Sequence, residues 1–305
     1  MDTSGNESED TLGIVFAFAQ AFCWASTSIV LRSLATELNP FLVNGLRAAT
    51  GMLIIIPLVW ITGGLSDYQY VTTTHILCLV GSVILGGVIG DALYVNSLRI
   101  LSVGQAFPIT NSHPLFTVLF GALLLGTDVT WKLLLGLMLT LLGVYFIGRP
   151  RSHIKETDAS PLPLQQMIQG LLLAVGTAVL WGAATVILAF GLQDINSVVA
   201  TSIRVPVVII LSLLVAAKGG HLSEIRKMKP HTFRLLLLAG ILGWGMAGTL
   251  YATAVKFAGP NKAAIIGATA PLFASPLSAI FLKERPTRYT LIGTALTIGG
   301  VILIL

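Results

Sequence analysis

Residues 75–98 read HILCLVGSVILGGVIGDALYVNSL, an apolar run that contains one aspartate, Asp91. Its pattern returns in residues 233–255, FRLLLLAGILGWGMAGTLYATAV, where Leu242-Gly243 and Leu250-Tyr251 keep the spacing of Leu85-Gly86 and Leu93-Tyr94. Each run is longer than the roughly 20 residues that carry a helix across a bilayer. The two runs therefore predict two related membrane spans, separated by an offset of 157 residues.

The same offset relates the rest of the chain. It pairs Trp24 with Trp181, Asn39 with Asn196, Arg47 with Arg204, and Pro114-Leu115-Phe116 with Pro271-Leu272-Phe273. We therefore predict a polar N-terminal tail over 1–10, a first unit over 11–148, a polar linker over 149–166 and a second unit over 167–305.

The composition is that of a membrane protein. Among 305 residues there are 18 Lys and Arg and 13 Asp and Glu, about a tenth of the chain, where soluble domains carry about a quarter. Apolar residues make up 55% and the mean hydropathy is +0.88. The basic residues are scattered over short loops, so topology accounts for the net charge of +5 better than a nucleic-acid partner does.

These features predict an all-α integral membrane protein with ten spans, five in each unit. The spans are 11–34, 40–61, 75–98, 104–125, 131–148, 167–192, 197–217, 233–255, 260–282 and 289–305. Because five is odd, the second unit must enter the membrane from the opposite side, which is the inverted topology of many secondary transporters.

Loop charge predicts the orientation. Twelve basic residues lie in loops after odd-numbered spans, whereas the opposite face holds only Lys132, Lys256 and Lys262. Since the Lys- and Arg-rich side stays cytoplasmic, we expect a multi-pass protein of the plasma membrane with both termini outside.

The ordered motifs resemble the drug/metabolite transporter superfamily, specifically its ten-span family with two EamA domains. The first spans read Cys23-Trp24-Ala25-Ser26-Thr27 and Leu180-Trp181-Gly182-Ala183-Ala184-Thr185, each second span carries an Arg, each fourth span carries Pro-Leu-Phe, and Leu-Lys-Glu-Arg ends at Arg285. The first unit departs from the family with Thr127-Asp128 where the second has Glu284. The resemblance implies export, or less often uptake, of amino acids, other metabolites or amphiphilic compounds, driven by an ion or proton gradient. Many relatives keep both termini in the cytoplasm, whereas the charge pattern of this chain favours the outside.

Two titratable residues are candidates for proton coupling. Asp91 is the one carboxylate well inside a span, and His113 lies deep in the fourth span on a polar stripe with Thr110 and Thr117. Ionisable groups are costly in lipid, so each one calls for a functional or structural reason. Asp91 and His113 could exchange a proton with each cycle; alternatively, Asp91 is the structural partner of an intramembrane arginine such as Arg47.

A central cavity is predicted from polar and aromatic faces on spans 1, 3, 4, 6, 8 and 9. The candidate substrate-binding residues are Gln20, Trp24, Thr27, Tyr94, Asn111, Trp181, Trp244 and Tyr251. Arg47 and Arg204 are of second rank: they could bind a substrate carboxylate or phosphate, or could cap neighbouring helix ends. Pro114, Pro271 and Pro276 are expected to kink their helices and free a backbone carbonyl in each.

We therefore predict a secondary active transporter, more often an exporter, of small organic solutes such as amino acids or amphiphilic metabolites, with alternating access and possible proton coupling. The expected partners are a small-molecule substrate, the lipid bilayer and a proton or ion, with no nucleic acid, no metal and no cofactor, in a monomer or homodimer without enzymatic activity. The alternatives are an organic-anion exchanger of the nucleotide-sugar or sugar-phosphate type and a membrane scaffold or receptor that transports nothing.

Overall fold

The computed structural model describes residues 3–101, 106, 109–147, 163–273 and 288–305. Pro276, most of the predicted linker 149–166 and the motif that ends at Arg285 lie outside the described residues.

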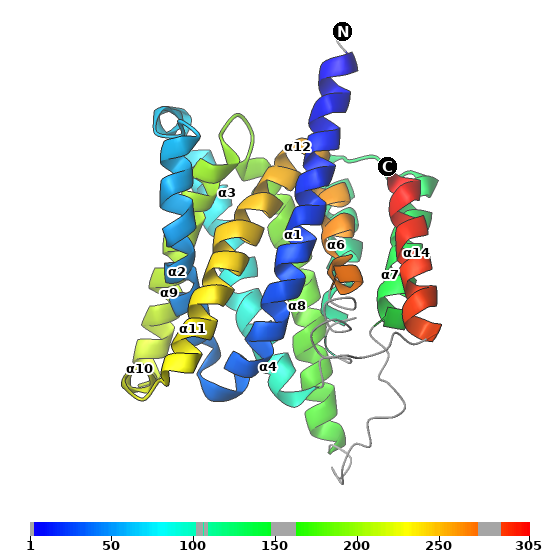
Figure 1. Cartoon of the computed structure of the whole chain (residues 1–305). Coiled ribbons are helices and arrows are strands. Elements are labelled where there is room, and N and C mark those ends of the chain that lie inside the picture. The colour runs from blue at the N-terminus through cyan, green and yellow to red at the C-terminus, as the bar shows by residue number, and fades with distance from the viewer. Residues whose placement is uncertain (1–2, 102–105, 107–108, 148–162, 274–287) are drawn as a thin grey trace.

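The described part of the chain is helical, which confirms the predicted class (Figure 1). The first half contains α1 (Thr3–Glu37), α2 (Pro40–Ile61), the 3₁₀ segment η1 (Ser66–Tyr70), α3 (Thr73–Val83), the π-helical segment η2 (Ile84–Gly90), α4 (Asp91–Ile100), α6 (His113–Leu125) and α7 (Trp131–Ile147). The second half contains α8 (Leu164–Gly191), α9 (Ser197–Lys218), α10 (Ser223–Arg226), α11 (Pro230–Ala239), the π-helical segment η3 (Gly240–Ala247), α12 (Gly248–Gly267) and α14 (Arg288–Ile304). Six helical runs are long and apolar enough to cross a membrane, and three further apolar helices among the described residues are shorter.

Helix boundaries repeat between the halves at the offset seen in the sequence. Thus α2 and α9 start and end at equivalent residues, and so do α7 and α14. The local cause is visible at the N-caps, where Asn39 Oδ1 accepts from the Phe41 N–H and Asn196 Oδ1 accepts from the Val198 N–H. An asparagine cap satisfies backbone donors that the first turn leaves unpaired, so it fixes where each helix begins.

A π-helical segment interrupts the third span and another interrupts the eighth, where the sequence predicts continuous α-helix. The segments η2 and η3 lie over the two glycine-rich stretches, and Asp91 and Gly248 directly follow them. Glycine lets a neighbour approach closely here, since a Cβ added at Gly86 would lie 2.8 Å from the Cβ of Ala184 on α8. π-Helical turns occur frequently at functional sites, so a functional site is expected at the level of η2 and η3 in the bundle.

Of the prolines predicted to kink their helices, Pro114 and Pro271 lie at helix starts, whereas Pro57 and Pro206 lie inside α2 and α9. Asn111 and Ser112 form a turn, and Pro114 is in the first helical turn of α6 after that turn. Ala268 and Thr269 form the equivalent turn before Pro271. The kink predicted at each proline is therefore a two-residue break in the helix, followed by a new start that proline tolerates because it lacks only an N–H that would be unpaired.

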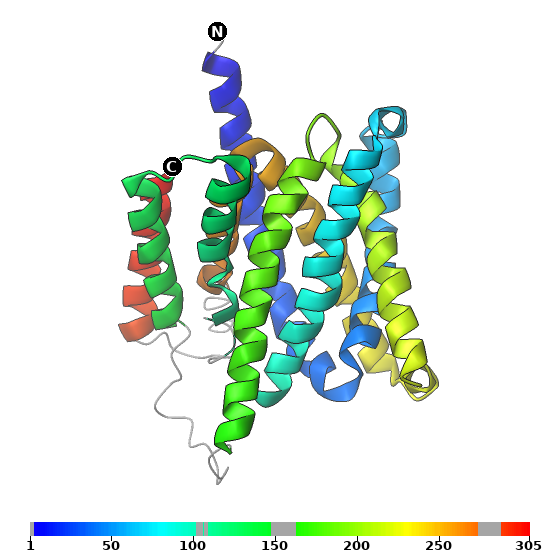
Figure 2. The same ribbon diagram turned by 180° about the vertical axis from the view of Figure 1, so that it is seen from behind.

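Both termini lie at one end of the bundle, and the short helix α10 lies at the other (Figure 1). The first helix of each half runs in the opposite direction to its counterpart, since α1 begins at the end with the termini and α8 begins at the far end. Seen from behind, α3 and α8 lie side by side, so helices of the two halves are intermixed (Figure 2).

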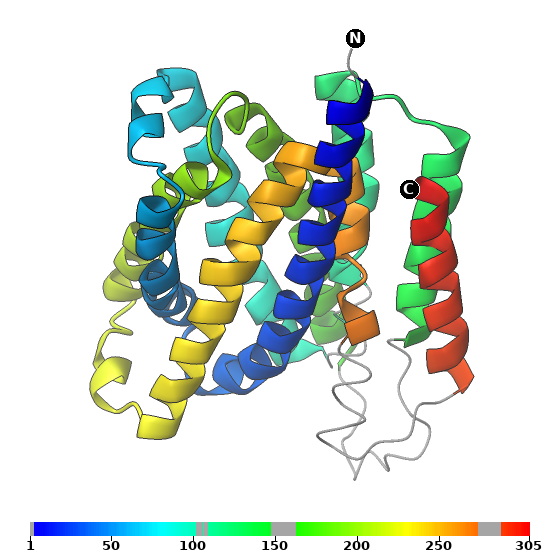
Figure 3. The same cartoon turned by 45° about the horizontal axis from the view of Figure 1, so that its top comes forward.

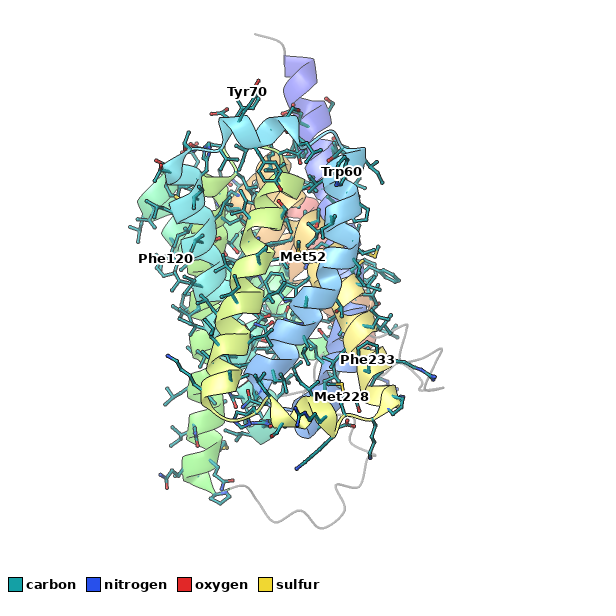
Figure 4. The ribbon with its side chains drawn as sticks, turned by 90° about the vertical axis from the view of Figure 1, so that its left-hand side faces the viewer. Met52, Trp60, Tyr70, Phe120, Met228 and Phe233 are labelled. Carbon is teal, nitrogen blue, oxygen red and sulfur yellow. The ribbon has the colours of Figure 1, made fainter. Side chains whose placement is uncertain are left out.

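Exposed aromatic side chains mark the two ends. Trp60 and Tyr70, 69% and 60% exposed, lie towards one end, and Phe233, 56% exposed, lies near the other (Figure 4). Aromatic residues gather at both membrane interfaces, so this distribution fits a bundle that spans the bilayer along its long axis.

The helices α7 and α14 form a separate pair at one edge of the bundle (Figure 3). Glycines make the contact, and they make it reciprocally: Gly136 faces the Gly300 carbonyl and Gly300 faces the Gly136 carbonyl. Gly143 and Gly293 face each other in the same way. Small residues let membrane helices pack backbone to backbone, where van der Waals contact is the main attraction.

This packing predicts different effects for adjacent glycines on α14. A Cβ at Gly300 would lie 2.6 Å from the Gly136 carbonyl oxygen, whereas a Cβ at Gly299 would meet nothing within 4 Å. We expect Gly300→Ala to destabilise the purified protein by about 1–3 kcal/mol, as overpacking does. Gly299→Ala is the matched control and should leave the thermal unfolding temperature in detergent unchanged or slightly raised, because alanine is the better helix former. Equal melting temperatures for the two variants would contradict the packing described.

Candidate functional site

A cavity of about 160 Å³ lies between the halves at the level of η2 and η3. Both halves supply its walls. The lining residues are Gln20, Trp24, Arg47, Gly86, Gly87, Asp91, Asn111, His113, Trp181, Ala184, Thr185, Leu188, Arg204, Gly243, Trp244, Ala247, Gly248, Tyr251 and Gly267. The site is thus polar and aromatic inside a bundle whose outer surface is apolar.

One wall holds a buried ion pair between Arg47 of α2 and Asp91 at the start of α4. The exposed fraction is 2% for Arg47 and 7% for Asp91. Asn44, one turn before Arg47, accepts from its Nε at 3.2 Å and its Nη2 at 3.1 Å. The side chain of Asp91 is therefore the structural partner of Arg47, the alternative that the sequence left open.

Indoles from the second half complete this network. Trp181 Nε1 of α8 donates to Asp91 Oδ1 at 3.1 Å, and Trp244 Nε1 of η3 donates to Asn44 Oδ1 at 3.2 Å. The Arg47 guanidinium also lies 5.9 Å from the centre of the Trp244 ring, a cation–π distance. The charged pair of one half is thus held in place by aromatic donors of the other.

Trp181 is also the centre of an aromatic cluster. Its ring centre lies 5.8 Å from that of Trp24, 5.3 Å from that of Tyr94 and 5.9 Å from that of His113. The Trp24 and His113 rings meet it edge to face, an arrangement that aromatic quadrupoles favour. Asp91 and His113, the two titratable candidates, therefore contact the same indole.

Arg204 of α9 lines another part of the cavity wall and is 9% exposed. Its Nε is buried without a hydrogen-bond partner, and no carboxylate of the described residues pairs with it. Nearby on this wall, the hydroxyls of Thr185 and Tyr251 are hydrogen bonded at 2.8 Å. The offset of 157 residues explains the missing partner, because Gly248 occupies the position equivalent to Asp91.

Gln20 adds an acceptor without a partner. Its side chain is 8% exposed, and its Oε1 is buried without a hydrogen bond from the described residues. Buried polar atoms in proteins are nearly always satisfied, so such an atom in a cavity wall is available to a solute or to water.

Most of the predicted binding residues line the cavity. They are Gln20, Trp24, Asn111, Trp181, Trp244 and Tyr251, and the candidates Asp91, His113, Arg47 and Arg204 line it too. The structure does not bring Thr27 to the wall, because its hydroxyl donates to the Cys23 carbonyl and its side chain faces Gly243. Tyr94 is buried behind Trp24 and Trp181.

Sequence reasoning missed Asn44, and the two arginines that it placed in second rank both line the cavity. The spacing of three residues between Asn44 and Arg47 places both on one helix face, which was the signal available. Among the described residues no cluster of His, Cys, Asp or Glu is arranged to hold a metal ion.

Comparison with known proteins finds relatives by family model, by sequence and by structure. Residues 11–149 and 168–305 each match the model of the EamA-like transporter family. An uncharacterized transporter of Archaeoglobus fulgidus is 27% identical over 296 residues, which cover 96% of this chain and 98% of that protein. One solved crystal structure superposes with a TM-score of 0.72 at 18% identity and covers 96% of each chain, so it shares the fold.

The buried ion pair predicts that the destabilising effects of substitutions at Arg47 and Asp91 are not additive. Asp91→Asn leaves the Arg47 charge unpaired and should destabilise the protein by about 3–5 kcal/mol, whereas Asp91→Asn with Arg47→Gln should recover most of that loss. Thermal unfolding in detergent measures both. A double variant as unstable as the sum of its single variants would show that the two side chains do not act as a pair.

Proposed function

Because the chain belongs to the EamA-like transporter family, we propose that it moves small organic solutes, such as amino acids or amphiphilic metabolites, as a secondary active transporter. The observation that carries the proposal is the central cavity, whose polar and aromatic walls come from both halves. A scaffold or receptor would have no need to keep two arginines, an aspartate and a histidine in the middle of an apolar bundle, where each is costly.

We propose ten spans arranged as two inverted five-helix units, over 11–148 and 167–305. The equivalent boundaries of α2 and α9 and of α7 and α14 support this arrangement. The contact of α7 with α14 also supports it. Gly136 meets Gly300 and Gly143 meets Gly293, and the offset of 157 makes Gly136 equivalent to Gly293 and Gly143 equivalent to Gly300. Two equivalent contacts that exchange in this way are a sign of two-fold symmetry.

Alternating access would require contacts between the halves to break at one end at a time. At the end with α10, Thr232 donates to Glu37 at 2.6 Å and the Asn39 N–H donates to Glu224 at 2.9 Å. Partial burial by itself would raise the pKa of Glu224, but the hydrogen bonds from Asn39 and His221 lower it, so the carboxylate form is favoured.

At the end with the termini, Lys262 pairs with Asp10 at 2.7 Å and Tyr68 bonds Ser202 at 2.6 Å. These contacts are candidates for the outer gate, and those around Glu37 and Glu224 for the inner one. Their polar character suits a gate, because exposed ion pairs and hydrogen bonds cost little to exchange for water.

His113 and Asp91 are the candidates for proton coupling, a role that for Asp91 would come in addition to its structural pairing with Arg47. Both contact Trp181, so a change in protonation at either one would alter the same wall of the cavity. The proton would be exchanged for substrate as the cavity changes sides, which couples the gradient to transport.

One observation favours a second candidate, an organic-anion exchanger, since Arg47 and Arg204 both line the cavity. The network around Arg47 speaks against a strongly anionic substrate such as a sugar phosphate, because Asp91 already neutralises that arginine.

Flux into proteoliposomes tests the transport function. The purified protein, screened against amino acids and small amphiphiles with and without a pH gradient, should move a subset of them faster than empty liposomes do. We expect Asp91→Asn and His113→Ala to lose at least tenfold of the gradient-driven accumulation, while His231→Ala, at an exposed position in the first turn of α11, serves as the control. Full gradient-driven transport by both variants would rule out the coupling role.

Loop charge predicts the orientation, and fusion reporters after Leu305 test it. Alkaline phosphatase is active only outside the cytoplasm. Green fluorescent protein fluoresces in the cytoplasm but not after export in unfolded form. The phosphatase fusion should therefore be active and the fluorescent fusion dark. The opposite result would place both termini in the cytoplasm.

A further inference from the structure

We propose that the solute carried by this protein bears a carboxylate, and that Arg204 is the side chain that binds it. The inference rests on the proposed transport function and adds to it the chemical class of the substrate.

The charges that line the cavity do not balance. Two arginines and one aspartate face it; the aspartate forms its ion pair with Arg47, and although Arg204 lies within range of its charge, the two make no ion pair. Arginine keeps its charge inside proteins, so the wall retains one positive charge without a counterion among the described residues. A buried charge without a partner is strongly unfavourable, so a solute with a negative charge would stabilise this cation on binding.

The position of Arg204 fits a binding role better than a structural one. Arg47 has Asn44 and Asp91 as acceptors for its Nε and Nη2, with only Nη1 left unpaired, whereas Arg204 has no carboxylate partner among the described residues and its Nε is buried without an acceptor. The position that supplies the carboxylate in the first half is Gly248 in the second, and Gly248 itself lines the cavity. The second half therefore has an arginine equivalent to Arg47 but no carboxylate equivalent to Asp91, and the place of that carboxylate is part of the cavity.

A carboxylate fits this single guanidinium better than a phosphate does. The planar fork of arginine matches a carboxylate in two parallel hydrogen bonds and balances its one charge. A phosphate monoester carries close to two charges at neutral pH and would need a second unpaired cation. The rest of the solute would contact Trp24, Trp181, Trp244 and Leu188, so an apolar or aromatic body is expected.

Matched solutes test the inference in proteoliposomes of the full-length protein. The panel pairs each carboxylate with its primary amide, its amine and its phosphate ester on the same carbon skeleton: 3-phenylpropionate, 4-methylpentanoate and L-phenylalanine supply the carboxylates. We expect carboxylates to be transported, and their amides, amines and phosphate esters to move at least tenfold more slowly, because a site built for a charged hydrogen-bonding group rejects analogues that lack it.

Two variants make the assignment specific to Arg204. Arg204→Gln removes the charge and should bring the ratio of carboxylate to amide flux close to one. Gly248→Asp places a carboxylate at the position equivalent to Asp91 and should have the same effect by pairing with Arg204; a Cβ there meets its nearest neighbours at 3.6 and 3.7 Å, which is ordinary contact. Because the readout is a ratio of two fluxes, a general loss of folded protein does not imitate the result.

The outcomes separate the inference from the function on which it rests. Amides, amines or phosphate esters that move as fast as their carboxylates would overturn the role of Arg204 and leave transport standing. An unchanged carboxylate preference in both variants would do the same. A panel in which no solute of any class moves would count against transport itself, and the inference would fall with it.

Discussion

The constraint on which this structure depends is that lipid offers no partner to a buried charge. Arg47 and Asp91 meet that constraint together, with Asn44 as a further acceptor and the indoles of Trp181 and Trp244 as further donors. Because the charged residues come from one half and the indoles from the other, the network also fixes how the halves meet. The cavity is the space that this network and its incomplete counterpart around Arg204 leave between them.

The sequence predicted the helices well because their signals are local. Apolar runs and asparagine caps set the boundaries of α2 and α9, and the repeat predicted the agreement between them. The π-helical segments and the breaks before Pro114 and Pro271 were not predicted, since they depend on which neighbour packs against each glycine or proline. A count of apolar residues is the same for a straight helix and an interrupted one.

The candidate site was predictable as a set of residues but not as a set of contacts. Helical spacing placed Gln20 and Trp24 on one face of the first span, and both line the cavity, because spacing reports which face of a helix a residue is on. It placed Thr27 on the same face, yet that side chain returns to its own backbone. Which of two arginines would hold the one aspartate is decided by side-chain reach across helices, which periodicity does not contain.

The glycine contact between α7 and α14 has a mechanical consequence. Each glycine lies opposite a backbone carbonyl of its partner, so a slide of one helix along the other would drive a side chain such as Thr140 or Thr297 into that backbone. The two glycine contacts, Gly136 with Gly300 and Gly143 with Gly293, therefore oppose a sliding movement of α14 along α7.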